Sequence, residues 1–281
     1  MEVSTTCTVL SSDGTTIGYR QTGRGPGLIL VHGAMQSSRN FTKLAAALSD
    51  AFTVYVPDRR GRGLSGPFGE NYGIEKEVQD LAALVAATGA NNIFGLSSGA
   101  LITLQTALHV PSLHKIALYE PPLAIEGAPV SPMQWPPRYE AAMARGDLAA
   151  AMVETMKGTA DREFFTSLPR FILIPLMRQA IKKSAKESVP ENSLATRIRT
   201  VHFDCVVAEQ MAGTIESFRN LPQEVLLIGG TKSAPYLPIA LAALYEVLPN
   251  VSRTELPGLG HLAADDSGHP DQVAKELKRF F

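Results

Sequence analysis

The sequence contains few cysteines, few charged residues and no long hydrophobic run. Cys7 and Cys205 are the only cysteines among 281 residues, too few for a disulfide framework or a cysteine-based zinc cluster. Charged residues make up 19% of the chain, below the roughly 25% of an average globular protein, whereas hydrophobic residues make up 45%. This composition excludes a disordered chain and predicts a large buried core.

Neither sign of charge dominates, because 26 Lys and Arg residues face 27 Asp and Glu residues and leave a net charge of −1. A basic surface for nucleic acid or for an anionic membrane is therefore not expected. The N-terminal residues do not resemble a secretory signal, and no stretch reaches the roughly 18 apolar residues of a membrane span. We expect a cytoplasmic protein whose partner is a small apolar molecule, with a homodimer left open.

Short β-rich runs alternate with helical patterns over the first 120 residues. Residues 27–31 are apolar throughout, which is typical of a strand buried on both faces, and residues 74–85 carry apolar side chains at helical spacing. Strand patterns return at 225–229 and 251–256, and a terminal helix is expected at 270–281. This alternation predicts an α/β fold, a mostly parallel sheet flanked by helices.

Residues 124–215 contain helical patterns and prolines but no convincing buried strand. We therefore expect an α/β core formed by residues 1–123 and 216–281, with residues 124–215 inserted as a helical cap. The insertion holds six of the eight methionines, namely Met133, Met143, Met152, Met156, Met177 and Met211.

Methionine adapts to irregular apolar shapes, so this concentration indicates that the cap covers an apolar pocket. Met35, Trp135 and Phe171 are the expected substrate contacts. The alternative is that the apolar residues of the insertion only fill its own small core.

The strongest chemical signal is Gly95-Leu96-Ser97-Ser98-Gly99, which follows a predicted strand and opens a helical pattern that runs to His109. A serine on such a sharp strand-to-helix turn projects its hydroxyl away from the sheet, and the flanking small residues let helix and strand approach each other. The helix N-terminus also directs free N–H groups toward the site. We expect Ser97 to be a catalytic nucleophile.

The loop His32-Gly33-Ala34-Met35 follows the first buried strand. The backbone N–H groups of Ala34 and Ser98 are the expected oxyanion hole, a pair of donors that stabilises negative charge on a reacting carbonyl oxygen. His32 itself is expected to hold the loop rather than to act as a base.

His261 is the expected general base. It follows the last predicted strand on the glycine-rich loop 257–260, from which its imidazole can reach Ser97 and accept the hydroxyl proton. The competing histidines lie in the insertion, in a surface turn or away from the strand ends that carry the site: His109, His114, His202 and His269.

Gly61, Gly63 and Gly66 match the spacing of a dinucleotide-binding fingerprint. That fingerprint requires a helix that begins at the motif, and Pro67 and Phe68 follow here instead. We expect no organic cofactor and no metal.

Four motifs occur together in a characteristic order: His32-Gly33, Asp58-x-Arg60-Gly61-x-Gly63-x-Ser65, Gly95-x-Ser97-x-Gly99 and Gly258-x-Gly260-His261. In this order and spacing they resemble the α/β-hydrolase fold family over the whole chain. The resemblance implies a serine hydrolase with a helical cap inserted after the sixth strand of the family's usual numbering. Ser97 argues against the dehalogenases and epoxide hydrolases that use an aspartate nucleophile.

The triad acid departs from the family pattern. Relatives usually carry it in a Gly-x-x-Asp segment after the strand that follows the cap, and the matching segment here places Lys232 at that position. Glu120 is the expected replacement, because it ends a buried strand at the sheet edge that carries the site residues, and Pro121 and Pro122 stiffen its backbone. This arrangement resembles some haloalkane dehalogenases and the zearalenone lactonases.

Other assignments of the acid stay open. Glu120 could instead pair with a loop arginine such as Arg60, and Asp204 in the insertion is a second candidate for the acid. Asp265 and Asp266 follow His261 too closely to lie behind its imidazole easily, so they are expected to be solvated or to cap the last helix.

The sequence thus predicts hydrolysis of a carboxylic ester or lactone through an acyl-enzyme on Ser97, with His261 as base and then acid and Glu120 orienting it. A non-catalytic ligand receptor or pseudoenzyme on the same fold is the main alternative, supported by Lys232. A lyase or a hydrolase of C–C bonds would use the same constellation.

Overall fold

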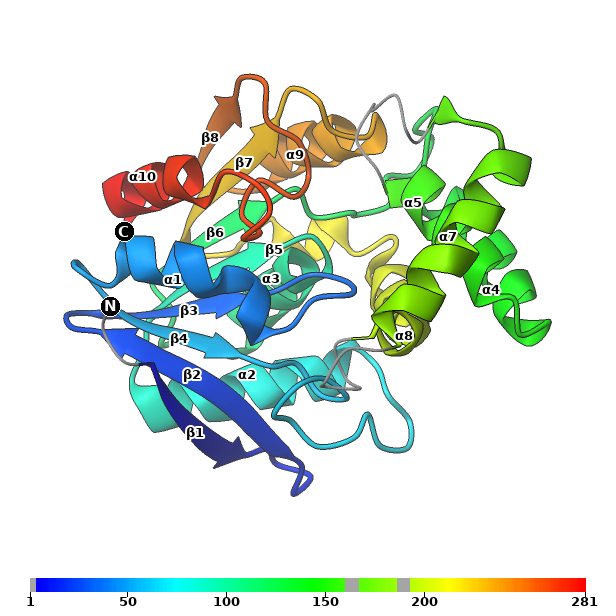
Figure 1. Cartoon of the computed structure of the whole chain (residues 1–281). Helices are drawn as coiled ribbons and strands as arrows, with labels where there is room; N and C mark the ends of the chain where they lie inside the picture. Colours follow the sequence, from blue (N-terminus) through cyan, green and yellow to red (C-terminus); the bar gives the residue numbers. More distant parts are fainter. Residues whose placement is uncertain (1–3, 160–166, 186–192) are drawn as a thin grey trace.

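A computed structural model describes residues 4–159, 167–185 and 193–281 and shows one central eight-stranded sheet (Figure 1). Its strand order is β1-β2-β4-β3-β5-β6-β7-β8, and β2 runs antiparallel to both neighbours while the other pairs are parallel. The predicted α/β class is confirmed. The strands are β1 (Thr5–Leu10), β2 (Thr16–Gly23), β3 (Gly27–Val31), β4 (Thr53–Pro57), β5 (Asn92–Leu96), β6 (Lys115–Tyr119), β7 (Glu224–Gly230) and β8 (Val251–Leu256).

Helices cover both faces of this sheet, which explains why its central strands are apolar throughout. The helices that cover the sheet are α1 (Thr42–Leu48), α2 (Ile74–Thr88), α3 (Ser98–His109), α9 (Tyr236–Val247) and α10 (Pro270–Phe280). Within β3, Leu28 and Leu30 pack in one core cluster with side chains of α1 and α10, whereas Ile29 and Val31 pack with side chains of α2, α3 and α9. Leu28 and Leu30 therefore face one helical layer, and Ile29 and Val31 face the other.

Helices α4 (Pro136–Ala144), α5 (Leu148–Thr159), α7 (Arg170–Ser184) and α8 (Leu194–Met211) lie between β6 and β7 along the chain. They gather to one side of the sheet, beyond the arrowheads of β3 and β4 in Figure 1. Tyr139, Ala151, Ile198 and Val201 form a small separate core among them. We call α4, α5, α7 and α8 the inserted helices; the predicted domain bounds stay a prediction.

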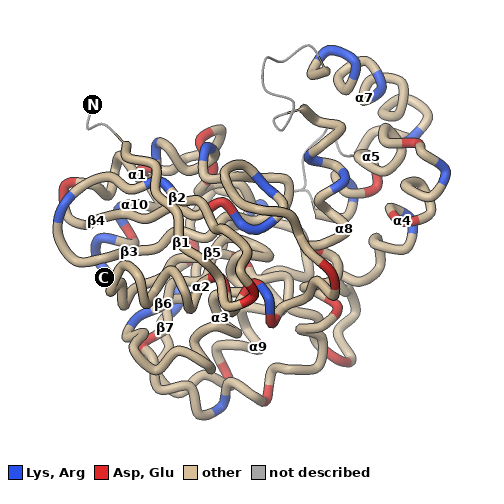
Figure 2. Tube along the Cα trace, turned by 90° about the horizontal axis from the view of Figure 1, so that it is seen from below, with Lys and Arg blue, Asp and Glu red and all other residues tan. Residues whose placement is uncertain are grey.

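Charged residues of both signs are interspersed along the chain (Figure 2). Within the described part of the chain, no helix combines the length and apolarity that crossing a membrane requires.

Candidate active site

Ser97 stands at the turn between β5 and α3, where its backbone adopts φ 56° and ψ −124°. A non-glycine residue rarely adopts a positive φ, so the surrounding packing must hold it. Neighbouring glycines make that packing close: a Cβ at Gly95 would come within 2.5 Å of the Gly99 carbonyl oxygen, and one at Gly99 within 2.4 Å of the Val31 oxygen. The two glycines of the motif therefore let α3 start directly against the strands.

The structure brings Ser97, His261 and Glu120 into one hydrogen-bonded chain. The Oγ atom of Ser97 lies 2.9 Å from Nε2 of His261, and Nδ1 of His261 lies 2.7 Å from Oε2 of Glu120. His261 is 164 residues from Ser97 and 141 residues from Glu120 along the chain, so the fold brings distant segments together. Glu120 is buried and His261 nearly so. This is the geometry in which an imidazole accepts a hydroxyl proton while a carboxylate fixes its orientation.

Glu120 is held by two further donors, one at the end of β7 and one shortly after it. Its Oε1 atom accepts hydrogen bonds from the Gly230 N–H at 2.7 Å and from the Ser233 hydroxyl at 2.5 Å. The backbone of Glu120 itself has φ 48°, a left-handed conformation at the end of β6. Lys232 is exposed and takes no part in this network. The segment that usually supplies the acid therefore supplies donors to the glutamate of the neighbouring strand.

The loop that carries His261 is anchored to the loop that carries Ala34. Asp265 accepts hydrogen bonds from the side chains of Gln36 at 2.7 Å and Asn40 at 2.8 Å, and Gln36 Oε1 accepts the Gly33 N–H at 2.8 Å. The expectation that Asp265 is solvated is wrong, because these contacts bury it. Asp266 does not cap α10 either: it accepts the Lys43 N–H at 2.8 Å, and His269 stands at the start of α10.

A cavity of about 530 Å³ opens beside Ser97, and Ala34, Ser98 and His261 also line it. Most of its remaining wall is apolar and comes from the inserted helices and the segment before them, including Trp135, Met152, Met156, Val201 and Cys205. Met35 also lines this cavity. Burial raises the pKa of the Cys205 thiol, which disfavours the thiolate there. We call this the active-site cavity.

Phe171 does not line the active-site cavity, and the expectation that it contacts substrate there is wrong. Its side chain is 76% exposed near the start of α7. The apolar run 171–176 covers every side of this helix, and only Leu173 on the inward side is fully buried. Apolar character alone therefore did not identify the packed side.

Asp204 belongs to a buried cluster of charges next to Ser98, and it does not contact His261. Its Oδ1 atom accepts hydrogen bonds from Arg59 at 2.8 Å and from the Ser98 hydroxyl at 2.7 Å, and Oδ2 accepts from Arg62 at 2.6 Å. Burial alone would raise the pKa of Asp204, but the charges of Arg62 and Arg59 hold it below its usual value.

Arg59 extends this buried cluster to α2. Its guanidinium donates to both carboxylate oxygens of Glu77, to the Ser98 hydroxyl and to Tyr72. The side chains of Arg59 and Glu77 are each 2% exposed. The cluster formed by Arg59, Arg62, Glu77 and Asp204 escaped the sequence reasoning. Its only sequence signal is the presence of three arginines in one strand-end loop of a charge-poor chain.

His32 is fully buried and links two strand ends, as expected for a structural histidine. Nδ1 lies 3.0 Å from the Gly33 oxygen and Nε2 accepts the Arg59 N–H at 3.2 Å. Burial, together with Arg62 and Arg59, lowers the pKa of His32 well below its usual value. The competing histidines are exposed and lie away from Ser97: His109, His114, His202 and His269.

Arg60, the alternative partner of Glu120, binds elsewhere. Its guanidinium donates to Asp80 at 2.7 and 2.6 Å and to Asp13 at 3.0 Å. In the described residues, no group of three or more histidine, cysteine or acidic side chains is arranged to hold a metal ion.

Comparison with known proteins places this geometry in a family. The model of the "Alpha/beta hydrolase family" matches residues 28–276. An α/β hydrolase from Sphaerobacter thermophilus DSM 20745 has a similar solved structure, with a TM-score of 0.76, 30% identity, and coverage of 98% of this chain and 100% of that one.

Two curated relatives match nearly the whole chain. The pimeloyl-[acyl-carrier protein] methyl ester esterase of Stenotrophomonas maltophilia (strain K279a) is 25% identical over 92% of this chain and 94% of its own length. The 2-(acetamidomethylene)succinate hydrolase of Mesorhizobium japonicum is 24% identical over 94% of this chain and 91% of its own length. The fold, the motifs and the family match over residues 28–276 together show that this chain belongs to the alpha/beta hydrolase family.

Proposed function

We propose that the protein is a serine hydrolase that cleaves a carboxylic ester or lactone of an apolar small molecule through an acyl-enzyme on Ser97. One observation carries the proposal: the hydrogen-bonded chain from Ser97 through His261 to Glu120 lies at the wall of an apolar cavity. A nucleophile, a base within 2.9 Å and a carboxylate that orients the base are the parts that acyl transfer requires.

In the first half-reaction, the Ser97 Oγ attacks the carbonyl carbon of the bound ester while Nε2 of His261 takes the hydroxyl proton. Glu120 holds the other ring nitrogen and stabilises the imidazolium. The backbone N–H groups of Ala34 and Ser98 stabilise the oxyanion of the tetrahedral intermediate. When the intermediate collapses, the C–O bond to the alcohol breaks and His261 returns the proton to the leaving oxygen.

In the second half-reaction, water attacks the acyl-enzyme with His261 again acting as base. Its proton passes through the imidazole to the Ser97 oxygen, which leaves, and the carboxylic acid is released. No redox step and no cofactor enter this cycle. In a lactone the leaving hydroxyl stays attached to the acyl group, so a single hydroxy acid is released.

The apolar wall of the active-site cavity indicates that the substrate carries an apolar group next to the scissile bond. Trp135, Met152 and Met156 offer large, adaptable surfaces to it. The methyl ester esterase relative supports an ester as the substrate. The receptor alternative rested on Lys232, and it loses that support because a different carboxylate, that of Glu120, contacts His261.

Amide hydrolysis is a second candidate, favoured by the full-length similarity to the 2-(acetamidomethylene)succinate hydrolase. The same residues would serve it, with His261 giving its proton to a leaving nitrogen instead of an oxygen. Comparing kcat/KM for an ester and for the amide of the same acyl group separates the two candidates.

The decisive experiment labels the intact protein with a fluorophosphonate and locates the adduct by mass spectrometry, alongside turnover of short- and long-chain p-nitrophenyl esters. We expect the adduct on Ser97, and Ser97→Ala should lose both labelling and several orders of magnitude of turnover. Ser112→Ala, which removes an exposed serine, is the matched control. Labelling and turnover retained in Ser97→Ala would refute the acyl-enzyme.

A further inference from the structure

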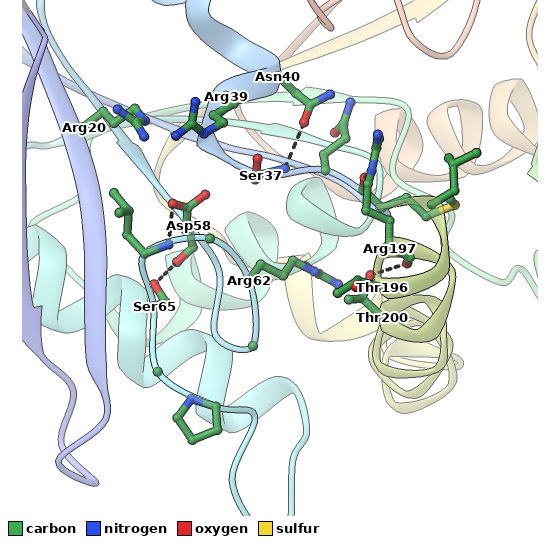
Figure 3. Close-up of a pocket in the computed structure, with 18 of the residues that line it drawn as sticks. Arg20, Ser37, Arg39, Asn40, Asp58, Arg62, Ser65, Thr196, Arg197 and Thr200 are labelled. Carbon is green, nitrogen blue, oxygen red and sulfur yellow. Dashed lines mark hydrogen bonds between the residues drawn. The ribbon is translucent and has the colours of Figure 1, made fainter. Parts of the chain in front are cut away.

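A second cavity of about 440 Å³ adjoins the active-site cavity (Figure 3). The loop after β4, which carries the glycines 61, 63 and 66, forms one side, and the start of α8 forms another. Both cavities share the wall residues Met35, Gln36, Asn40, Leu194 and Arg197. A ligand that extends past this shared wall would occupy both.

The lining of the second cavity is rich in positive charge. It contains four arginines, Arg20, Arg39, Arg62 and Arg197, and two acidic residues, Asp58 and Asp266, while Arg62 is also paired with Asp204, which lies outside this lining. Such a gathering of arginines is unusual in a chain whose net charge is −1.

Within the described residues, neither acid of this lining forms an ion pair with one of its arginines. Asp58 is buried, and its two oxygens accept the N–H groups of Ser38 at 2.5 Å and Leu64 at 2.9 Å. Asp266 accepts the Lys43 N–H at 2.8 Å. Both carboxylates instead accept backbone N–H groups of nearby residues.

Arg62 gives the sharpest indication of a ligand. Its side chain is only 4% exposed, and in the described part of the chain its one ion pair joins Nη2 to Asp204, which also binds Arg59. Within the described residues, its Nε and Nη1 atoms are buried without a hydrogen-bond partner. In Figure 3 the side chain extends from the loop toward Thr196, Arg197 and Thr200. Buried N–H groups of a cation are the donors that a carboxylate or phosphate oxygen accepts best.

Arg197 connects this feature to catalysis. It lines both cavities, and its Nε atom donates to the Met35 carbonyl at 2.6 Å, on the loop next to Ala34. A charged group bound by Arg62 and Arg197 would thus lie next to the active-site cavity, with the remainder of the same molecule inside it.

We propose that the second cavity is an anion-binding subsite that holds a carboxylate or phosphate group of the substrate, while the ester carbonyl lies at Ser97. The inference rests on the proposed function and narrows its substrate class to esters with an apolar stretch next to the scissile bond and an anionic group at a distance from it.

The kinetic test compares monomethyl esters of dicarboxylic acids of increasing length with the corresponding ω-carboxamide esters and ω-phosphate esters. The wild type should prefer an anionic ester over its neutral counterpart by at least tenfold in kcat/KM at the best chain length. Arg197→Gln and Arg39→Gln should each lower that ratio at least fivefold. Arg199→Gln, which removes an exposed charge from the same helix outside the cavity, should leave the ratio within twofold of wild type.

A binding test keeps the subsite distinguishable from the hydrolase proposal. The Ser97→Ala protein and the double variants that add Arg197→Gln, Arg39→Gln or Arg199→Gln are each titrated by calorimetry with inorganic phosphate and with glutarate. Arg197→Gln and Arg39→Gln should each weaken anion binding at least fivefold, and Arg199→Gln should not. If no ester is cleaved but this arginine dependence holds, the subsite stands and the esterase proposal fails.

The stronger of phosphate and glutarate identifies the anionic group. The proposal is overturned if kcat/KM is about the same for anionic and neutral esters at every chain length. It is also overturned if Arg199→Gln lowers the ratio of these kcat/KM values as much as Arg197→Gln and Arg39→Gln do, or if anions bind to the protein but the preference for anionic esters does not depend on these arginines.

Discussion

Replacing Asp204 by Asn tests whether the buried charge cluster holds α8 onto the core. The carboxylate of Asp204 faces only donors: Arg59 and the Ser98 hydroxyl on one oxygen and Arg62 on the other. An asparagine of the same size must turn its NH₂ group toward one of these sets. The NH₂ group then faces the donor of a neighbouring side chain and cannot bond to it. Two buried arginines, Arg59 and Arg62, are left with one carboxylate, that of Glu77.

The expected cost follows from burial. The side chains of Asp204, Arg59 and Arg62 are 6%, 2% and 4% exposed, so water cannot replace the lost partner. Removing one member of a buried ion pair typically costs about 3–5 kcal/mol. At roughly 2 °C per kcal/mol for a chain of this size, the melting temperature should fall by about 6–10 °C.

Urea and thermal denaturation of Asp204→Asn, beside the matched variant Glu209→Gln, measure this effect. Glu209 is exposed on the same helix, so its replacement should change stability by less than about 0.5 kcal/mol. Arg62→Met should cost less in the Asp204→Asn background than in the wild type, with a coupling of about 1 kcal/mol or more. A loss below about 1 kcal/mol in Asp204→Asn would refute the reasoning.

The buried ion pairs of Asp204 also predict how the stability of the protein depends on pH. Since the pKa of Asp204 is lower in the folded protein than the ordinary value of 3.8, the unfolded chain binds the proton more readily. The stabilisation is therefore complete above about pH 4–5 and is lost as the pH falls through the folded value. The stability difference between wild type and Asp204→Asn should be constant from pH 5 to 7 and should narrow below pH 4.

Two further predictions concern the site. Glu120→Gln, which removes the charge behind His261, should lower kcat by roughly 10⁴-fold. The kcat of Lys232→Ala should stay within about tenfold of wild type. Equal activity of Glu120→Gln and wild type in an ester assay would disprove the assignment. Trp135→Ala should change KM and the preferred acyl length because Trp135 lines the active-site cavity, while Phe171→Ala should alter neither, and a KM shift in the Phe171 variant would contradict its exposed position.

The sequence reveals those parts of the fold and site whose causes are local. The apolar strands and the Gly95–Gly99 turn follow from side chains within a few residues of one another, so their patterns predict them well. The pairing of Glu120 with His261 spans 141 residues, yet strand-end reasoning anticipates it, because the carboxyl ends of parallel strands meet at one edge. Its role in catalysis stays a prediction.

Features that depend on distant packing could not be predicted. Arg59 and Asp204 are 145 residues apart, and no spacing rule connects a loop arginine to an aspartate on an inserted helix. For Phe171, an apolar run without periodicity gives no information about which side of α7 packs. Residues 38–48 are divided into a 3₁₀ turn, Ser38–Phe41, and α1, a division that sequence patterns do not resolve.

The position of α8 limits how the active-site cavity can open. Arg197, Val201 and Asp204 recur at helical spacing along one side of α8, and all three line the active-site cavity. Asp204 is fixed to the core through Arg59 and Arg62, and Gln210 near the end of the helix accepts the Ile74 N–H at 2.7 Å. Moving α8 away would break these contacts and disturb Ser98, which flanks the nucleophile. Opening for substrate entry should therefore come from the other inserted helices, while α8 stays fixed and forms one side of both cavities.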